Sequence, residues 1–308
     1  MGRIAASAFM SLRTTIPFSA YHYAIPSREL GLALHSPFVP SAVSSRPAIT
    51  NNAMSASTSS DANIEVDIAS NIASVRQRID DAVSANGRPQ GSVRLVAVSK
   101  TKPIEFLQVA YKNGQRYFGE NYAQELMTKA NHLPDDVSWH FIGPLQSNKA
   151  GPLVKSVGLN KLACVETVST LKLAAKLNRA VESMNEDLVD KKKLGIYIQV
   201  NTSGEESKSG VSPGGEVADL VKKISEECPW LSIDGLMTIG APGDDSSFDT
   251  LRLCRDEVSV VLDCDPNDLE LSMGMSGDFE VAIAKGATSV RVGSTIFGDR
   301  DYSSEPAN

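Results

Sequence analysis

Two spacings of apolar residues alternate along this chain. Between residues 64 and 83, Ile and Val recur every three or four positions, which predicts an amphipathic helix that ends near Asn86 and Gly87. After it, short apolar runs of strand length alternate with longer stretches of helical spacing. The expected strands span residues 93–99, 116–119, 138–142, 162–165, 194–200, 233–239, 269–273 and 289–292. The expected helices span residues 103–113, 169–184, 248–262 and 278–285, and others begin at Asn121, after Pro144 and at Ser212.

This alternation predicts the fold class. Eight strand–helix pairs within about 200 residues indicate an α/β protein with a (β/α)8 barrel, the TIM-barrel fold. The alternative is an open, doubly wound sheet, which typically carries a glycine-rich phosphate loop after its first strand. No G-x-G-x-x-G follows residues 93–99, so we prefer the barrel. We expect residues 61–302 to form it as a single domain.

The first expected strand delivers a lysine to its C-terminal end. Residues 93–99 contain no turn residue, which fits a strand covered on both faces. Pro103 favours the start of a helix, so the strand should stop near Lys100. Because side chains alternate along a strand, Val98 and Lys100 share one face, whereas Lys102 falls in the turn. Lys100 therefore points into the barrel, unless it only reaches solvent from the strand end.

Two later loops are rich in glycine and hydroxyl residues. They follow the seventh and eighth expected strands, at residues 273–278 and 291–298, where such barrels commonly bind phosphate. Glycine lets backbone N–H groups approach an anion, and the helix expected after Asp278 adds partial positive charge. Turn formation alone also explains either loop. A lysine facing a phosphate site indicates Schiff-base chemistry with a phosphorylated aldehyde, such as pyridoxal phosphate or the sugar phosphate of an aldolase.

The amino-acid composition argues against several classes of function. Of the 308 residues, 42% are hydrophobic and 22% are charged, and the formal net charge is -7. This acidic balance argues against a nucleic-acid partner, which needs clustered Lys and Arg. No apolar run is long enough to span a membrane. The four cysteines are widely spaced and form no C-x-x-C, which favours neither a metal site nor a disulfide framework and indicates a reducing compartment.

The first 60 residues have a composition of their own. They contain one acidic residue, Glu29, against four arginines, and they are dominated by Ser, Ala, Thr and Pro without a consistent period. This composition is typical of an organellar transit peptide, and the alternative is a disordered tail. A transit peptide would place the protein in a plastid or a mitochondrion. Without one, the expected location is the cytoplasm.

Ordered motifs along the chain resemble one known family. The motifs are VAVSKTKP (96–103), FGEN (118–121), HFIGPLQSNK (140–149), VNTSGE (200–205), KSGV (208–211), LSMGMS (271–276) and RVGS (291–294). Over roughly residues 63–298 they resemble the pyridoxal phosphate homeostasis proteins, also called proline synthase co-transcribed proteins. This family has the barrel of the alanine racemase N-terminal domain, the fold-type III arrangement of pyridoxal phosphate enzymes.

The resemblance implies a cofactor and the residues that bind it. Lys100 would carry pyridoxal 5'-phosphate as an internal aldimine, and Arg291 would lie near the pyridine nitrogen. An arginine there keeps this nitrogen unprotonated and weakens the electron sink that most catalysis with this cofactor uses. Ser276, together with the backbone of Gly293 and Ser294, would hold the phosphate.

Two further polar residues have two interpretations each. Asn121 faces the cofactor from the second loop, or it caps the following helix. His140 lies inside an apolar strand and is either a hydrogen-bonded core histidine or a functional one.

The chain end bears on the function that we expect. A related racemase takes its second base from a C-terminal β domain, whereas ten residues follow Gly298 here. We therefore expect a monomeric carrier for vitamin B6 homeostasis, with no catalytic residue assigned, which stores the cofactor or delivers it to apo-enzymes. The alternatives are a weak amino-acid racemase, a lysine-dependent aldolase or lyase, or a barrel that only binds other proteins.

Overall fold

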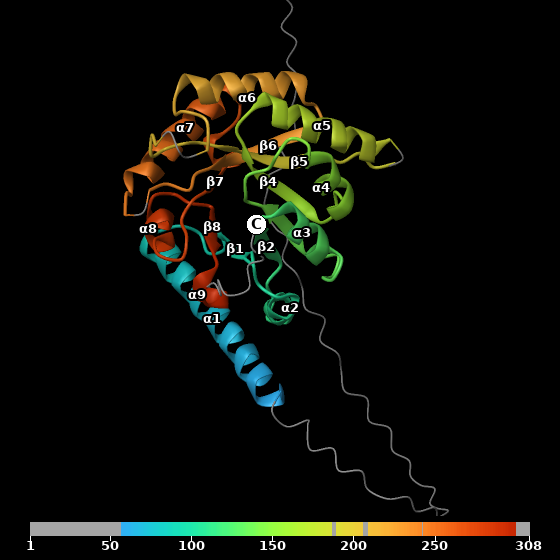
Figure 1. Cartoon of the computed structure of the whole chain (residues 1–308). Coiled ribbons are helices and arrows are strands. Elements are labelled where there is room, and N and C mark those ends of the chain that lie inside the picture. The colour runs from blue at the N-terminus through green and yellow to red at the C-terminus, as the bar shows by residue number, and fades with distance from the viewer. Residues whose placement is uncertain (1–56, 187–188, 206–208, 242, 300–308) are drawn as a thin grey trace, which may run out of the picture. The chain divides into compact units, whose positions relative to one another are not determined.

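The computed structural model describes residues 57–186, 189–205, 209–241 and 243–299, all within one compact unit. Its centre is a closed barrel of parallel strands in the order β1 to β8, with β8 paired to β1 (Figure 1). The (β/α)8 fold predicted from the sequence is therefore confirmed.

Short strands and longer helices alternate along the chain. The strands are β1 (Arg94–Val98), β2 (Tyr117–Glu120), β3 (Ser138–Phe141), β4 (Leu162–Val168), β5 (Leu194–Gln199), β6 (Leu231–Met237), β7 (Glu270–Ser272) and β8 (Ser289–Val292). The helices are α1 (Ser57–Ala85), α2 (Ile104–Lys112), α3 (Ala123–Ala130), α4 (Ala150–Val157), α5 (Leu171–Asn185), α6 (Gly215–Glu227), α7 (Ser246–Leu262), α8 (Phe279–Ala284) and α9 (Ser294–Phe297), with a 3-10 turn at Pro266–Asp268. None of the helices in the described ranges is long and apolar enough to cross a membrane.

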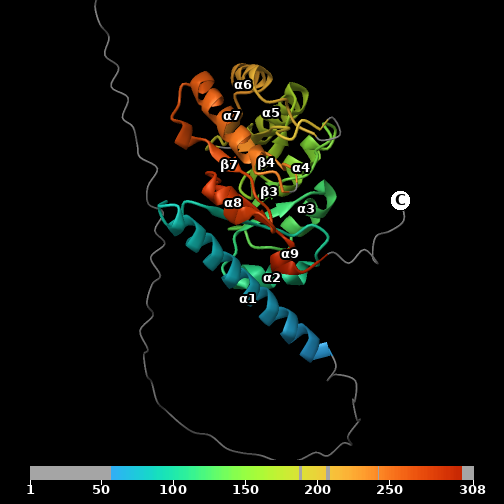
Figure 2. The ribbon, with the colours of Figure 1, turned by 90° about the vertical axis from the view of Figure 1, so that its left-hand side faces the viewer.

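Closure of the barrel explains the continuous apolar runs in the sequence. Strand β1 pairs with β8 in register, with Val96 opposite Arg291 and Ala97 opposite Val292. Helices surround the barrel (Figures 1 and 2), so most strand residues are buried whether they point inward or outward. Because all strands run in one direction, their C-terminal ends meet at one rim.

Helix α1 lies outside the barrel, against α2, α8 and α9 (Figure 2). Its apolar stripe is buried as the spacing predicts, at Ile68, Ile72, Val75, Ile79 and Val83. The helix begins at Ser57, so the last residues of the expected 60-residue extension are helical. The rest of that extension lies outside the described residues.

The expected bounds of two strands are wrong by two residues or more. Strand β4 continues past Val165 to Val168 and includes the fully buried Glu166. A carboxylate inside an apolar strand is unfavourable unless it is paired, and the partners of Glu166 come from other strands. Strand β6 begins at Leu231, earlier than expected.

The expected starts of three helices, α3, α4 and α6, are also wrong. Helix α3 has Tyr122 as its N-cap, so the interpretation of Asn121 as the cap is wrong. Helix α6 begins at Gly215 and not at Ser212, and its N-cap is Gly214, whose φ of 92° suits glycine. Helix α4 begins at Ala150, well after Pro144. The path of each loop decides which residue first adopts helical dihedral angles, and a polar residue nearby does not.

The buried stripe of α1 generates a stability prediction. Ile72 is 1% exposed, so Ile72→Ala should lower the free energy of unfolding by about 2–5 kcal/mol through lost burial and the cavity left behind. Ser74 is exposed on the same helix, and Ser74→Ala should change this free energy by less than about 0.5 kcal/mol. Urea unfolding followed by circular dichroism measures both. Equal effects would mean that α1 is not part of the cooperative unit.

Candidate functional site

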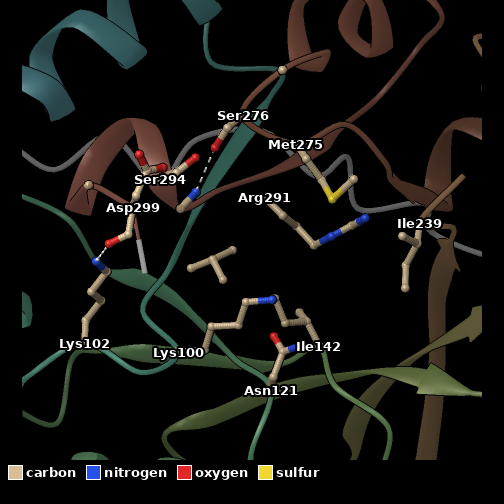
Figure 3. A pocket seen from close by; sticks show the side chains of 14 residues that line it. Lys100, Lys102, Asn121, Ile142, Ile239, Met275, Ser276, Arg291, Ser294 and Asp299 are labelled. Carbon is tan, nitrogen blue, oxygen red and sulfur yellow. Dashed lines mark hydrogen bonds between the residues drawn. The ribbon is translucent and has the colours of Figure 1, made fainter. Parts of the chain in front are cut away.

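The loops after β1, β2, β7 and β8 form most of a cavity of about 560 Å³ at the C-terminal rim of the barrel (Figure 3). The six residues expected to bind a cofactor all line it: Lys100, Asn121, Ser276, Arg291, Gly293 and Ser294. Its apolar walls include Val98, Ile142, Ile239 and Met275. These residues are far apart in sequence, and closure of the barrel brings them together.

Lys100 follows the end of β1 and shares the cavity wall with Val98, as the strand alternation predicts. In Figure 3 its side chain extends across the cavity towards Asn121. Thr101 has a φ of 63°, in the left-handed region that β-branched residues rarely adopt. The chain is therefore held in a strained conformation directly after the lysine.

A buried cluster holds the backbone on both sides of Lys100. The Lys129 amine donates hydrogen bonds to the Ser99 carbonyl at 2.7 Å and to Glu120 Oε1 at 2.8 Å. It also donates to Glu125 Oε1 at 2.6 Å, and this oxygen accepts the Thr101 N–H at 2.7 Å. One ammonium group therefore connects the two peptide groups that flank the lysine, which compensates for the strain at Thr101 and orients Lys100.

The carboxyl group of Glu120 belongs to the same cluster. Its Oε1 accepts the Ser99 hydroxyl at 2.6 Å, and its Oε2 is buried without a partner among the described residues. Burial raises the pKa of Glu120 to about 7, although the positive charge of Lys129 opposes the shift. The Glu120 carboxyl therefore titrates near neutral pH.

Arg291 reaches the cavity from β8, yet only 5% of the residue is exposed. Its guanidinium donates to Ser272 Oγ and to the Thr238 carbonyl, both at 2.7 Å. Burial lowers its pKa from the usual value, while the negative charges of Glu166 and Asp278 oppose this shift. A guanidinium stays protonated in proteins, so Arg291 fixes a positive charge at the cavity wall.

Glu166 balances this buried charge through Ser272. The Ser272 hydroxyl donates to Glu166 Oε2 at 2.6 Å, and His140 Nδ1 lies 2.6 Å from Glu166 Oε1. Burial acts to raise the pKa of Glu166, but the hydrogen bond from His140 and the charge of Arg291 outweigh it and lower this pKa. His140 is 2% exposed, so it is a hydrogen-bonded core histidine that supports the carboxylate.

The two glycine-rich loops, which follow β7 and β8, meet at one end of the cavity. The Gly293 N–H donates to Ser276 Oγ at 3.2 Å (Figure 3). A Cβ atom at residue 293 would lie 3.3 Å from Val98, so glycine suits the close approach of this loop to β1. Ser294 begins the short helix α9, so its backbone N–H belongs to the first helical turn. Hydroxyl and amide donors thus converge at one place.

Asn121 and Lys102 complete the cavity wall. Asn121 Oδ1 is buried and has no hydrogen-bond partner among the described residues, although the side chain lines the cavity. A Cβ atom at Gly143 would lie 2.0 Å from the Asn121 carbonyl, so glycine lets the two loops touch. The Lys102 amine donates to the Asp299 carbonyl at 2.6 Å, which holds it at the rim.

These groups fit pyridoxal phosphate. The cofactor needs anion-binding donors for its phosphate, an amine for its aldehyde and a partner for its ring nitrogen. The Ser276–Gly293 pair, Lys100 and Arg291 offer one of each. The unpartnered Asn121 oxygen leaves an acceptor that a bound ligand can satisfy.

The supporting residues are absent from the sequence prediction. Thr238, Ser272 and Glu166 hold the arginine, and Lys129 and Glu125 hold the backbone around the lysine. A lone carboxylate within the apolar run 162–168 was the one available signal, because a buried charge requires a partner. A lysine and a glutamate on a short helix give no such signal.

Comparison with known proteins defines the class. The family model described as the alanine racemase N-terminal domain matches residues 67–301. The alanine racemase of Corynebacterium glutamicum, at 14% identity, superposes with a TM-score of 0.55 over 77% of this chain and 62% of that one, which shows a shared fold. The protein is thus a barrel of the alanine racemase N-terminal kind.

Closer relatives identify the family. The chain is 44% identical to the pyridoxal phosphate homeostasis protein of Bos taurus over 252 residues, which covers 78% of this chain and 89% of that protein. PipY of Synechococcus elongatus, solved with PLP bound, is 32% identical with a TM-score of 0.58, over 75% of this chain and all of that one. The chain belongs to the pyridoxal phosphate homeostasis protein family, as its motifs suggested.

The pKa of Glu120 generates a prediction about pH. Its carboxyl binds a proton more tightly in the folded protein than in the unfolded chain, where the pKa is near 4.5. Its contribution to stability is therefore complete below about pH 4.5 and is lost as the pH rises to about 7, by about 3 kcal/mol. Glu120→Gln cannot ionise and should remove this part of the pH dependence. Urea unfolding at several pH values measures it.

The exposed Glu182 offers a matched control for this change. Glu182→Gln should leave the pH dependence of unfolding as in the unchanged protein. If Glu120→Gln behaves in the same way, folding does not raise the pKa of the Glu120 carboxyl and the assignment is wrong.

Proposed function

We propose that this protein binds pyridoxal phosphate, holds it on Lys100 and acts in intracellular vitamin B6 homeostasis with negligible catalysis. The observation that carries the proposal is the convergence of Lys100, Arg291 and the Ser276–Gly293 pair on one cavity. The name shared by relatives at 40–45% identity and the PLP-bound structure of PipY support the same ligand.

Each group of the cavity has a separate task in this proposal. Pyridoxal phosphate, when bound, supplies an aldehyde that reacts reversibly with an amine. Lys100 provides that amine, oriented by the Lys129 cluster. Ser276 and the N–H groups of Gly293 and Ser294 bind the phosphate. The positive charge of Arg291 opposes protonation of the ring nitrogen, which limits electron withdrawal by the ring.

The ionisable side chains of the cavity favour storage over catalysis. In the described part of the chain they are Lys100, Lys102, Arg291 and Asp299. A reaction at an amino-acid α-carbon needs a base positioned for the α-proton. Lys102 donates to the backbone of Asp299, Arg291 does not deprotonate, and Lys100 is assigned to the cofactor, so that Asp299 is the one other group among the four that can accept a proton. Weak racemase activity is the competing function, because alanine racemases share the fold.

Two further parts of the proposal concern partners. A store of cofactor is useful when it is released, so the expected recipients are apo-enzymes that use pyridoxal phosphate. We also propose that the protein acts as a monomer, because the described residues of one barrel bring Lys100, Arg291 and the Ser276–Gly293 pair together in one cavity.

The first test compares absorption spectra of two lysine variants. After incubation with pyridoxal phosphate, the protein should show a band above about 400 nm that Lys100→Ala lacks and Lys102→Ala retains. Both lysines line the cavity, so the pair separates covalent attachment from general positive charge. Loss of the band in Lys102→Ala alone would show that the cofactor attaches to Lys102 and not to Lys100. No band in any of the proteins would overturn the proposal.

Assays for amino-acid racemisation and for lyase activity on the loaded protein then decide between carrier and enzyme. Turnover that depends on Lys100 and reaches about 1 s⁻¹ or more, the range of ordinary enzymes, would contradict storage as the main role.

We further propose that residues 1–60 act as a transit peptide. Their excess of arginine over acidic residues supports this. A fusion of these residues to a fluorescent protein should enter a plastid or a mitochondrion in plant protoplasts. The same fusion with Arg3, Arg13, Arg28 and Arg46 changed to Gln should stay in the cytoplasm. Cytoplasmic fluorescence from both would contradict the proposal.

A further inference from the structure

A groove of about 770 Å³ lies between α4 and α5, outside the cofactor cavity. The two helices are neighbours in the outer layer (Figure 1). The groove is bounded by the turn at Gln146–Asn148 and by four cations, Lys155, Lys172, Lys176 and Arg179. No Asp or Glu is among the described residues that line it. The motif HFIGPLQSNK therefore ends in this groove and not in the cofactor cavity.

The side chains of these four cations have no partner of opposite charge among the described residues. All four are exposed, and within the described ranges none of their side chains makes an ion pair or a hydrogen bond. By contrast, Arg116 pairs with Asp136 at 2.8 Å, and Lys285 pairs with Asp249 at 2.6 Å. The chain as a whole carries a net charge of -7, so this concentration of positive charge is a local feature.

The spacing of the cations fits an extended acidic segment. Lys172, Lys176 and Arg179 lie four and three positions apart on one face of α5, so they span about 10 Å along the axis. In an extended peptide, alternate side chains on one side are about 7 Å apart, so two or three carboxylates match this length. The described residues that line the groove include hydroxyl and amide groups but no aromatic ring for a nucleotide base to stack on.

The groove and the cofactor cavity share the loop after β3. Ile142 lines the cavity, and Gln146, in the same loop, lines the groove. At the mouth of the cavity, Ile239 and Met275 are 47% and 36% exposed, and Tyr122 beside Asn121 is 51% exposed. Exposed apolar residues beside a charged region are typical of a protein interface, in which the charges steer and orient the partner.

We propose that the α4–α5 groove binds an acidic segment of the protein that receives the cofactor, so that the partner covers the cavity mouth. The identity of the partner as a recipient rests on the proposed function. The binding of an acidic segment rests on the geometry and charge of the groove alone.

The test uses the full chain and fluorescein-labelled hexaglutamate, with anisotropy as the measurement at low ionic strength. The peptide should bind the unchanged protein, and added salt should weaken the binding. Lys172→Glu with Lys176→Glu should weaken it by about tenfold or more. Lys222→Glu with Lys223→Glu, an equal change of charge on the exposed face of α6, should alter it less than about twofold.

Three results would overturn the proposal: no binding to the unchanged protein, equal loss in both double variants, or displacement of the peptide by inorganic polyphosphate at far lower charge concentration. The last result would assign the groove to a phosphate polyanion. Absorption of the bound cofactor, measured on the same samples, shows whether each variant is folded and loaded. Failure of loading in the unchanged protein would contradict the proposed function and leave the peptide result standing.

Discussion

The buried positive charge of Arg291 constrains the inside of this barrel. A guanidinium with 5% exposure is unfavourable unless hydrogen bonds and an opposite charge compensate it. Ser272 and the Thr238 carbonyl provide the bonds, and Glu166, supported by His140, provides the charge. Residues of β3, β4 and β7 and the residue that follows β6 thereby join Arg291 of β8 in one network. The arginine presents a fixed charge to the cavity because Ser272 and the Thr238 carbonyl bind its guanidinium inside the barrel.

Near Lys100, a second buried charge is likewise compensated by hydrogen bonds and by opposite charges. Lys129 is 6% exposed, and its ammonium joins two carboxylates to the backbone beside Lys100. This arrangement holds the short, strained segment that carries Lys100. The position of the lysine backbone relative to the phosphate loops is thereby set by the groups packed behind it. The Lys129 cluster supports the backbone of Lys100, and the lysine side chain lines the cavity in which a ligand can bind.

The cavity and the α4–α5 groove are connected through the loop after β3. Gly143 contacts the Asn121 backbone at the cavity, and the following residues reach the basic groove. A partner bound in the groove would therefore contact the loop that forms part of the cofactor wall. The cavity and the groove thus share one short segment of the chain.

The sequence by itself determined the barrel, the amphipathic helix α1 and the lysine on the interior face, because these follow from local periodicity and strand alternation. Its motifs also pointed to the family and to six residues of the cavity. Tertiary structure decided the end of β4, the helix starts and the role of His140. It also supplied the partners of Arg291 and Lys100. Glu166 and Ser272 are 106 positions apart, and no local pattern relates them. Barrel closure removes both residues from water. A charge buried in this way is stable only beside a partner, and this is why the two residues pair.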